Sequence, residues 1–177
     1  MATFGTPVTG DNDYTGWGEN EIEVFKCTLS ETADVSAMSA RLMVLSGTGK
    51  VRFVIYNDNA GAPGTLAFVT AEATFTNTSL GWISANKYGG GTTRLTAGSY
   101  WLGIWSGYSS VQWARKTTEY YPSAYSYGRG AGYSSTEPPP SPWSDSGYGV
   151  SDFTVHFVYA TYTVPVTGNP HYLYAQQ

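Results

Sequence analysis

The sequence predicts an all-β protein, folded as an antiparallel two-sheet sandwich of about eight strands. Only 12% of the 177 residues are charged, while 16% are aromatic, with 15 Tyr and 6 Trp. This balance is typical of strands and turns rather than of helices. Apolar and polar residues alternate with a period of two along most of the chain, and no convincing helical stripe interrupts them. A chain of this length suits one domain with its own core.

The first predicted strand covers Glu21–Leu29. Ile22 and Val24 lie on one face of it, whereas the apolar side chains from Phe25 onward lie on the other. Because the apolar positions change face between Val24 and Phe25, we predict a β-bulge at this point.

Three more strands are predicted in the first half of the chain, at 35–45, 50–56 and 65–75. The first two carry apolar side chains at every second position, as half-buried strands do. In the third strand, the same alternation predicts that Leu66 and Phe68 share one face.

Four further strands are predicted at 81–85, 99–105, 110–115 and 151–162. In the last one, Phe157 and Tyr159 are expected to share a face. Segments rich in Gly, Asn, Asp and Pro separate the strands, and the densest of these turn segments is 57–64. Strands at such short intervals are typical of a sandwich or a barrel.

Residues 117–149 lack this alternation and are predicted to form a long aromatic loop within a domain that spans 1–163. Loops beyond about 12–15 residues are uncommon and are often functional. Exposed aromatic side chains can stack on sugar rings or contact a protein partner. The candidate binding residues are Tyr120, Tyr121, Tyr125, Tyr127 and Trp143. The alternative is that these side chains pack the loop onto its own domain or onto a neighbouring subunit.

The two ends of the chain, 1–17 and 164–177, are predicted to be extended arms. Such arms could reach onto other virion or surface subunits and gain affinity through many weak contacts made at once. We therefore expect a homo-oligomer with closed symmetry.

Calcium is the one cofactor for which the sequence offers ligands. Asp11, Asp13 and Asp58 supply hard oxygen ligands in segments that are rich in Asn and Gly. The same residue types are also the commonest turn formers, because their side chains hydrogen-bond the nearby backbone. Turn chemistry is therefore the competing interpretation of these three residues.

The chain contains no G-x-S-x-G, H-E-x-x-H or C-x-x-C motif and no phosphate-binding Gly loop. Since only unplaced carboxylates are left for catalysis, we predict that the protein is not an enzyme. Its net charge of −4 and the lack of a basic stripe argue against nucleic acid as a partner. No apolar run approaches the roughly 18 residues that span a membrane, and the first residues do not resemble a signal peptide.

Three stretches stand out in this order: VIYNDNAGAPGTL at 54–66, LTAGSYWLGIW at 95–105 and VYATYT at 158–163. Together they resemble a broad group of β-sandwich domains found in phage and virus structural proteins and in secreted or surface-anchored microbial proteins. The resemblance implies a jelly-roll-like sandwich that serves attachment or surface display.

The expected function is that of a non-enzymatic virion surface protein, a capsid decoration or fibre component that mediates assembly or attachment. The alternative is a carbohydrate-binding module or adhesin of a secreted microbial protein. Both functions place the protein on a virion or outside the cell, and glycans are expected partners in the second.

Overall fold

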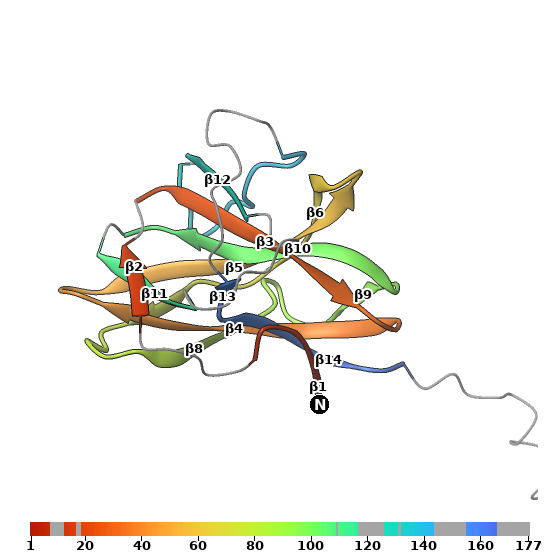
Figure 1. Ribbon diagram of the computed structural model, residues 1–177, viewed down its shortest axis with the longest axis horizontal. Helices are drawn as coiled ribbons and strands as arrows, with labels where there is room; N and C mark the ends of the chain where they lie inside the picture. The colour runs from red at the N-terminus through yellow and green to blue at the C-terminus, as the bar shows by residue number, and fades with distance from the viewer. Residues whose placement is uncertain are drawn as a thin grey trace, which may run out of the picture.

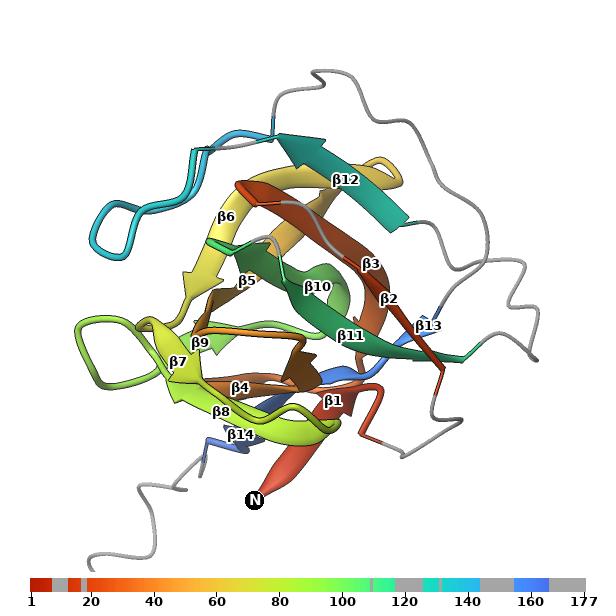
Figure 2. The ribbon, with the colours of Figure 1, turned by 90° about the vertical axis from the view of Figure 1, so that its left-hand side faces the viewer.

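The computed structural model of the chain describes residues 1–7, 13–16, 19–108, 110–116, 126–130, 132–143 and 155–165. These residues form strands and turns, and none of them belongs to a helix that could cross a membrane. Two antiparallel sheets pack face to face (Figures 1 and 2). The predicted two-sheet sandwich is therefore confirmed, whereas its jelly-roll connectivity stays a prediction.

The larger sheet contains eight of the described strands. Its main path is β1 (Ala2–Gly5), β14 (Val158–Thr163), β4 (Ala33–Val44), β11 (Val111–Lys116) and β13 (Val155–His156). Beside this path, β2 (Asp13–Gly16) pairs with β11, while β8 (Gly81–Asn86) and β9 (Thr93–Leu95) pair with β4. Strand β4 is central, because its residues 37–40 pair with β14 along one edge and with β8 along the other.

The smaller sheet contains six of the described strands. They follow the order β12 (Ser126–Gly130), β3 (Glu21–Leu29), β10 (Gly98–Ser106), β5 (Gly49–Asn59) and β6 (Ala62–Val69), and β7 (Ala73–Phe75) pairs with β5. Strands β5 and β6 form a hairpin at the place predicted to be an eight-residue turn. The turn itself is only Ala60-Gly61, whose φ angles of 51° and 92° are the positive values that a tight two-residue hairpin needs.

The main core lies between the two sheets. Phe53 and Leu102 enter it from the smaller sheet, and Met38, Leu42 and Trp113 enter it from the larger one. All five are at most 1% exposed. The every-second-position pattern predicted for the strands at 35–45 and 50–56 is confirmed by these contacts.

A second apolar cluster lies on the other face of the smaller sheet. It consists of Ile22, Val24, Val54, Tyr56, Trp101 and Trp105. Tyr133 and Trp143 pack against it from residues 132–143, a segment that we call the strap. Both faces of this sheet are therefore buried at its centre.

The bulge predicted in β3 is wrong. Strand β3 pairs with β10 from Glu21 to Leu29 without a register shift. Ile22 and Val24 belong to the second cluster, whereas Phe25 belongs to the main core. The apolar positions change face because both faces of the strand are buried, so that no extra residue is needed.

Bulges occur instead in β4 and β6. Ser36 has no partner in β14, which allows Val35 and Met38 both to face the main core. In β6, the pairs Ile55–Phe68 and Tyr56–Leu66 leave Ala67 as the extra residue. Leu66 therefore packs on the second cluster and Phe68 in the main core, and the prediction that they share a face is wrong.

The single strand predicted at 151–162 is interrupted. The chain pairs with β11 through β13, and it then pairs with β4 through β14. At the break, Phe157 is fully buried, while Tyr159 beyond it is half-buried against Trp82. Residues 151–154 lie outside the described part of the chain.

The first residues do not form an arm. Strand β1 pairs with β14, and its Phe4 is 6% exposed and belongs to the main core. Strand β2 pairs with β11. At the other end, Val164 is 50% exposed, and the predicted arm beyond residue 165 lies outside the described residues.

Candidate functional site

The strap begins with a turn that the local sequence builds. Ser134 Oγ accepts hydrogen bonds from the backbone N–H groups of Thr136 (3.2 Å) and Glu137 (2.8 Å). Ser and Thr commonly stabilise turns in this way. The turn brings the carbonyl oxygens of Ser134 and Glu137 to the same point, where both meet the side chain of Arg52.

Arg52 holds the strap against the smaller sheet. This arginine is 0% exposed, and its Nε donates to the carbonyl of Thr70 at 2.8 Å. Its Nη1 donates to the carbonyls of Ser134 at 3.2 Å and Glu137 at 2.5 Å. The guanidinium also lies 4.8 Å from the centre of the Tyr88 ring. Burial lowers the pKa of Arg52, but an arginine stays charged in a protein.

Tyr133 is the second anchor of the strap. Its ring packs on Trp105 with a centroid distance of 5.0 Å, and its hydroxyl donates to Glu72 Oε2 at 2.9 Å. A side chain at Gly107 would come within 2.4 Å of the Tyr133 ring, so the glycine makes room for this contact. Burial, and then the hydrogen bond and charge of Glu72, raise the pKa of Tyr133. The hydroxyl therefore keeps its proton near neutral pH and can donate to Glu72.

The far end of the strap covers the edge of β6. Trp143 N donates to the carbonyl of Gly64 at 2.8 Å, and Leu66 N donates to Ser141 Oγ at 3.0 Å. The Trp143 ring meets Tyr56 edge-on, with centroids 5.1 Å apart. Exposed strand edges invite pairing with other chains, and these contacts occupy that edge.

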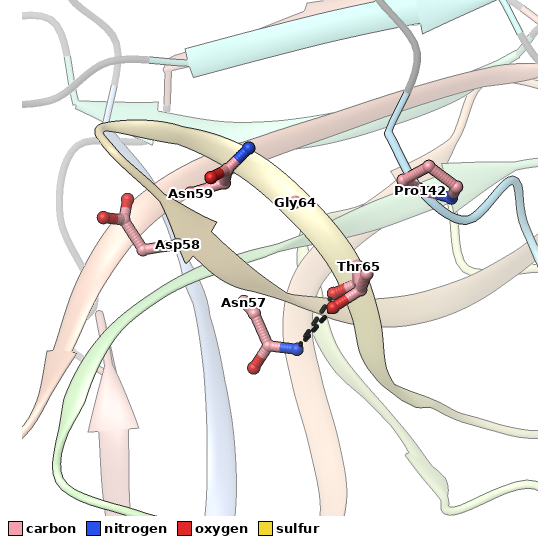
Figure 3. A pocket seen from close by; sticks show the side chains of 6 residues that line it. All are labelled: Asn57, Asp58, Asn59, Gly64, Thr65 and Pro142. Carbon is pink, nitrogen blue, oxygen red and sulfur yellow. Dashed lines mark hydrogen bonds between the residues drawn. The ribbon is translucent and has the colours of Figure 1, made fainter.

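A pocket of about 330 Å³ lies where the end of the strap meets the β5–β6 hairpin. It is lined by Asn57, Asp58, Asn59, Gly64, Thr65 and Pro142 (Figure 3). Asn57 and Thr65 point toward each other, and Asn57 Nδ2 donates to Thr65 Oγ1 at 2.9 Å and to its carbonyl at 3.2 Å. Amide, hydroxyl and backbone groups on two paired strands thus line the pocket together with Pro142.

Asp58 is already engaged on both carboxylate oxygens. Oδ1 accepts from Trp101 Nε1 at 2.8 Å and lies 3.0 Å from Lys26 Nζ, and Oδ2 accepts from Gly61 N at 3.2 Å. Burial raises the pKa of Asp58, but the hydrogen bonds from Lys26, Trp101 and Gly61 together outweigh it, and the pKa is lowered. These contacts favour a role for Asp58 in stabilising the turn over a role as a calcium ligand.

The other predicted metal ligands are not brought to Asp58 by any described contact. Asp11 and the side chain of Asp13 lie outside the described part. Among the described side chains, no group of three or more His, Cys, Asp or Glu could hold a metal ion. Cys27 packs against the main core, and burial raises the pKa of its thiol to about 12, so it is protonated at neutral pH.

Of the five aromatic residues predicted to bind a partner, only the Trp143 side chain is described. Trp143 packs the strap onto its own domain, which was the alternative interpretation of the aromatic loop. The backbone of Tyr127 lies in β12, paired with Val24. Its side chain and all of Tyr120, Tyr121 and Tyr125 lie outside the described residues.

From the sequence, Asn57 and Asn59 are expected only to be calcium ligands or turn formers, and Thr65 has no expected binding role. The role of Arg52 was also missed. One signal could have found it: Arg52 lies on the same face of a strand as the apolar Val54 and Tyr56. A charge on an otherwise apolar face is buried only when it has partners.

Replacing Trp143 with alanine should lower the free energy of unfolding by about 2 kcal/mol, less than the ~3–5 kcal/mol for a fully buried tryptophan. The reason is the loss of the edge-on contact with Tyr56. Urea unfolding would measure it, and Trp143→Phe, which keeps a ring, should cost less. Unchanged stability in Trp143→Ala would contradict a packing role.

No protein-family model matches the sequence, and no curated protein matches it either.

Proposed function

We propose that this protein is a non-enzymatic surface protein that attaches to glycans, with the pocket at the β5–β6 hairpin as its binding site. The observation that carries the proposal is the lining of that pocket, in which Asn57, Asn59 and Thr65 present amide and hydroxyl groups from paired strands. Ligand sites commonly use a few well-placed polar groups on a preformed scaffold. The resemblance to virion and secreted sandwich domains supports attachment as the purpose of such a site.

Attachment is better supported than assembly through arms. The assembly hypothesis relied on both ends of the chain. At the first end, β1 pairs with β14 and Phe4 lies in the main core, whereas residues 166–177 lie outside the described residues. A segment that completes its own sheet is not available to reach a neighbour. The pocket, in contrast, lies at a hairpin whose Asn59 and Thr65 are exposed.

Affinity electrophoresis of the purified chain through a panel of polysaccharides tests the proposal. We expect at least one polysaccharide to retard the protein, with a retardation that saturates as its concentration rises. An unrelated protein of similar size and charge serves as the control for sieving. If no polysaccharide in a broad panel retards the chain, glycan attachment is overturned and assembly with other subunits becomes the favoured function.

A further inference from the structure

We infer that the pocket binds one neutral sugar unit of a polysaccharide, and that it does so without calcium. This inference rests on the proposed function and deepens it, because it names the class of ligand and the groups that recognise it. It follows from the charge of the pocket, from the hydrogen-bonding capacity left in it, and from its shape.

The charge of the pocket favours a neutral ligand. Asp58 is the one ionisable residue in the lining, and the ammonium group of Lys26 lies 3.0 Å from its Oδ1. Since the two charges compensate each other, neither an anionic nor a cationic ligand gains from the lining. A calcium ion would have to displace Lys26, Trp101 and Gly61 from the carboxylate.

The remaining hydrogen-bonding capacity matches hydroxyl groups. Asn57 uses its Nδ2 on Thr65, and its Oδ1 accepts no hydrogen bond from any residue that the structure describes. Thr65 Oγ1 accepts from Asn57, so its own hydrogen can still be donated. Asn59 adds an amide with both a donor and an acceptor. A sugar hydroxyl both donates and accepts, and it can therefore bond to neighbouring groups of each kind.

The shape of the pocket suits a single ring. Its volume of about 330 Å³ is at the lower end of the ~300–1,000 Å³ typical of small-molecule sites. Gly64 keeps it hollow, because a Cβ there would lie 3.0 Å from Asn59 Cβ and 3.2 Å from the carbonyl oxygen of Asn57. Pro142 supplies an apolar wall for the C–H face of a ring.

A peptide strand is a poorer occupant. A peptide that adds to a sheet edge uses the main-chain groups of that edge. In β6, the carbonyl of Gly64 already accepts from Trp143, and the N–H of Leu66 already donates to Ser141. The strap thus occupies the groups that an added strand would need beside the pocket.

Variants of two lining residues test the inference. Asn59→Ala removes an exposed amide that makes no hydrogen bond within the described residues, and Thr65→Val removes the hydroxyl at nearly constant size. Loss of one hydrogen bond should weaken binding on the order of 10-fold. The matched control is Asn86→Ala, an exposed asparagine on β8 in the other sheet. Thermal unfolding checks that each variant is folded.

The probes are neutral polysaccharides (dextran, galactomannan, xylan and a mixed-linkage β-glucan) and anionic ones (alginate and polygalacturonate), each with calcium and with EDTA. We expect a neutral polysaccharide to retard the wild type equally in calcium and EDTA. Both lining variants should bind it on the order of 10-fold more weakly, and Asn86→Ala should bind it as the wild type does.

The outcomes separate the inference from the proposed function. Equal binding by all variants would place the site elsewhere, for instance at the half-exposed Trp82–Tyr159 pair. It would overturn the inference and the choice of this pocket as the binding site, while attachment to glycans stands. Binding of anionic polysaccharides alone, or binding lost in EDTA, would also overturn it. A wild type that binds nothing in the panel would overturn the proposed function itself.

Discussion

Replacing Arg52 with methionine should release the strap from the smaller sheet and lower the free energy of unfolding by about 3–5 kcal/mol. The methionine keeps the buried volume of the side-chain stem but leaves three carbonyl oxygens, those of Thr70, Ser134 and Glu137, without their donor. An unsatisfied buried polar group costs about 1–3 kcal/mol. Because the two strap carbonyls can regain partners only by turning to water, the strap should leave the sheet.

Urea unfolding measures the loss of stability, and limited proteolysis within 132–143 measures release of the strap. Arg94→Met is the matched control, because the side chain of Arg94 is 63% exposed and pairs with Asp34 on the surface. An exposed ion pair contributes only about 0–1 kcal/mol. Arg52→Lys should lie between the two, since an ammonium group cannot reproduce the planar fork of the guanidinium. Equal stability and equal protease resistance of Arg52→Met and Arg94→Met would contradict the anchoring role.

The strands could be predicted because their pattern is local. Strand β5 alternates Val51, Phe53 and Ile55 with Arg52 and Val54, and this pattern places the first three in one core whatever the partner strands are. The bulges could not be predicted, because each is defined against a neighbouring strand. A register shift opposite Ser36 or Ala67 exists only in the pairing with β14 or β5.

The site could be predicted less well than the fold, because its contacts are distant in sequence. Arg52 donates to carbonyls 82 and 85 residues away. The residues around position 52 therefore do not indicate a contact with 132–143. The aromatic content of the loop fits both an exposed binding surface and packing onto its own domain, and no local feature of the sequence decides between them. Trp143 completes a second cluster that exists only because Trp101 and Trp105 point away from the main core. The turn-forming residues at 57–64 do mark a place where the chain reverses, but paired strands, rather than a loop, carry most of them.

Replacing Gly103 with alanine should prevent stable folding. Gly103 lies in the middle of β10, where it pairs with Val24 of β3 on one side and with Val54 of β5 on the other. A Cβ at this position would lie 1.8 Å from the carbonyl oxygen of Glu23 and 2.7 Å from the Cα of Val24. Both are backbone atoms of a paired strand, so no side-chain rotation relieves the clash.

Relief of this clash requires β3 and β10 to separate where both faces of the sheet are buried. Separation would disturb the main core at Phe25 and the second cluster at Val24 together. Overpacking usually costs about 1–3 kcal/mol, and occasionally more; a backbone clash at a central strand pair should exceed that range. Since domains are stable by only about 5–15 kcal/mol, the soluble yield and the temperature of the thermal unfolding transition should both fall sharply.

The control is Gly81→Ala at the start of β8, where the nearest atom would be 3.5 Å away. A Gly103→Ala protein as stable as this control would mean that β3 can shift away from β10 without loss of either cluster.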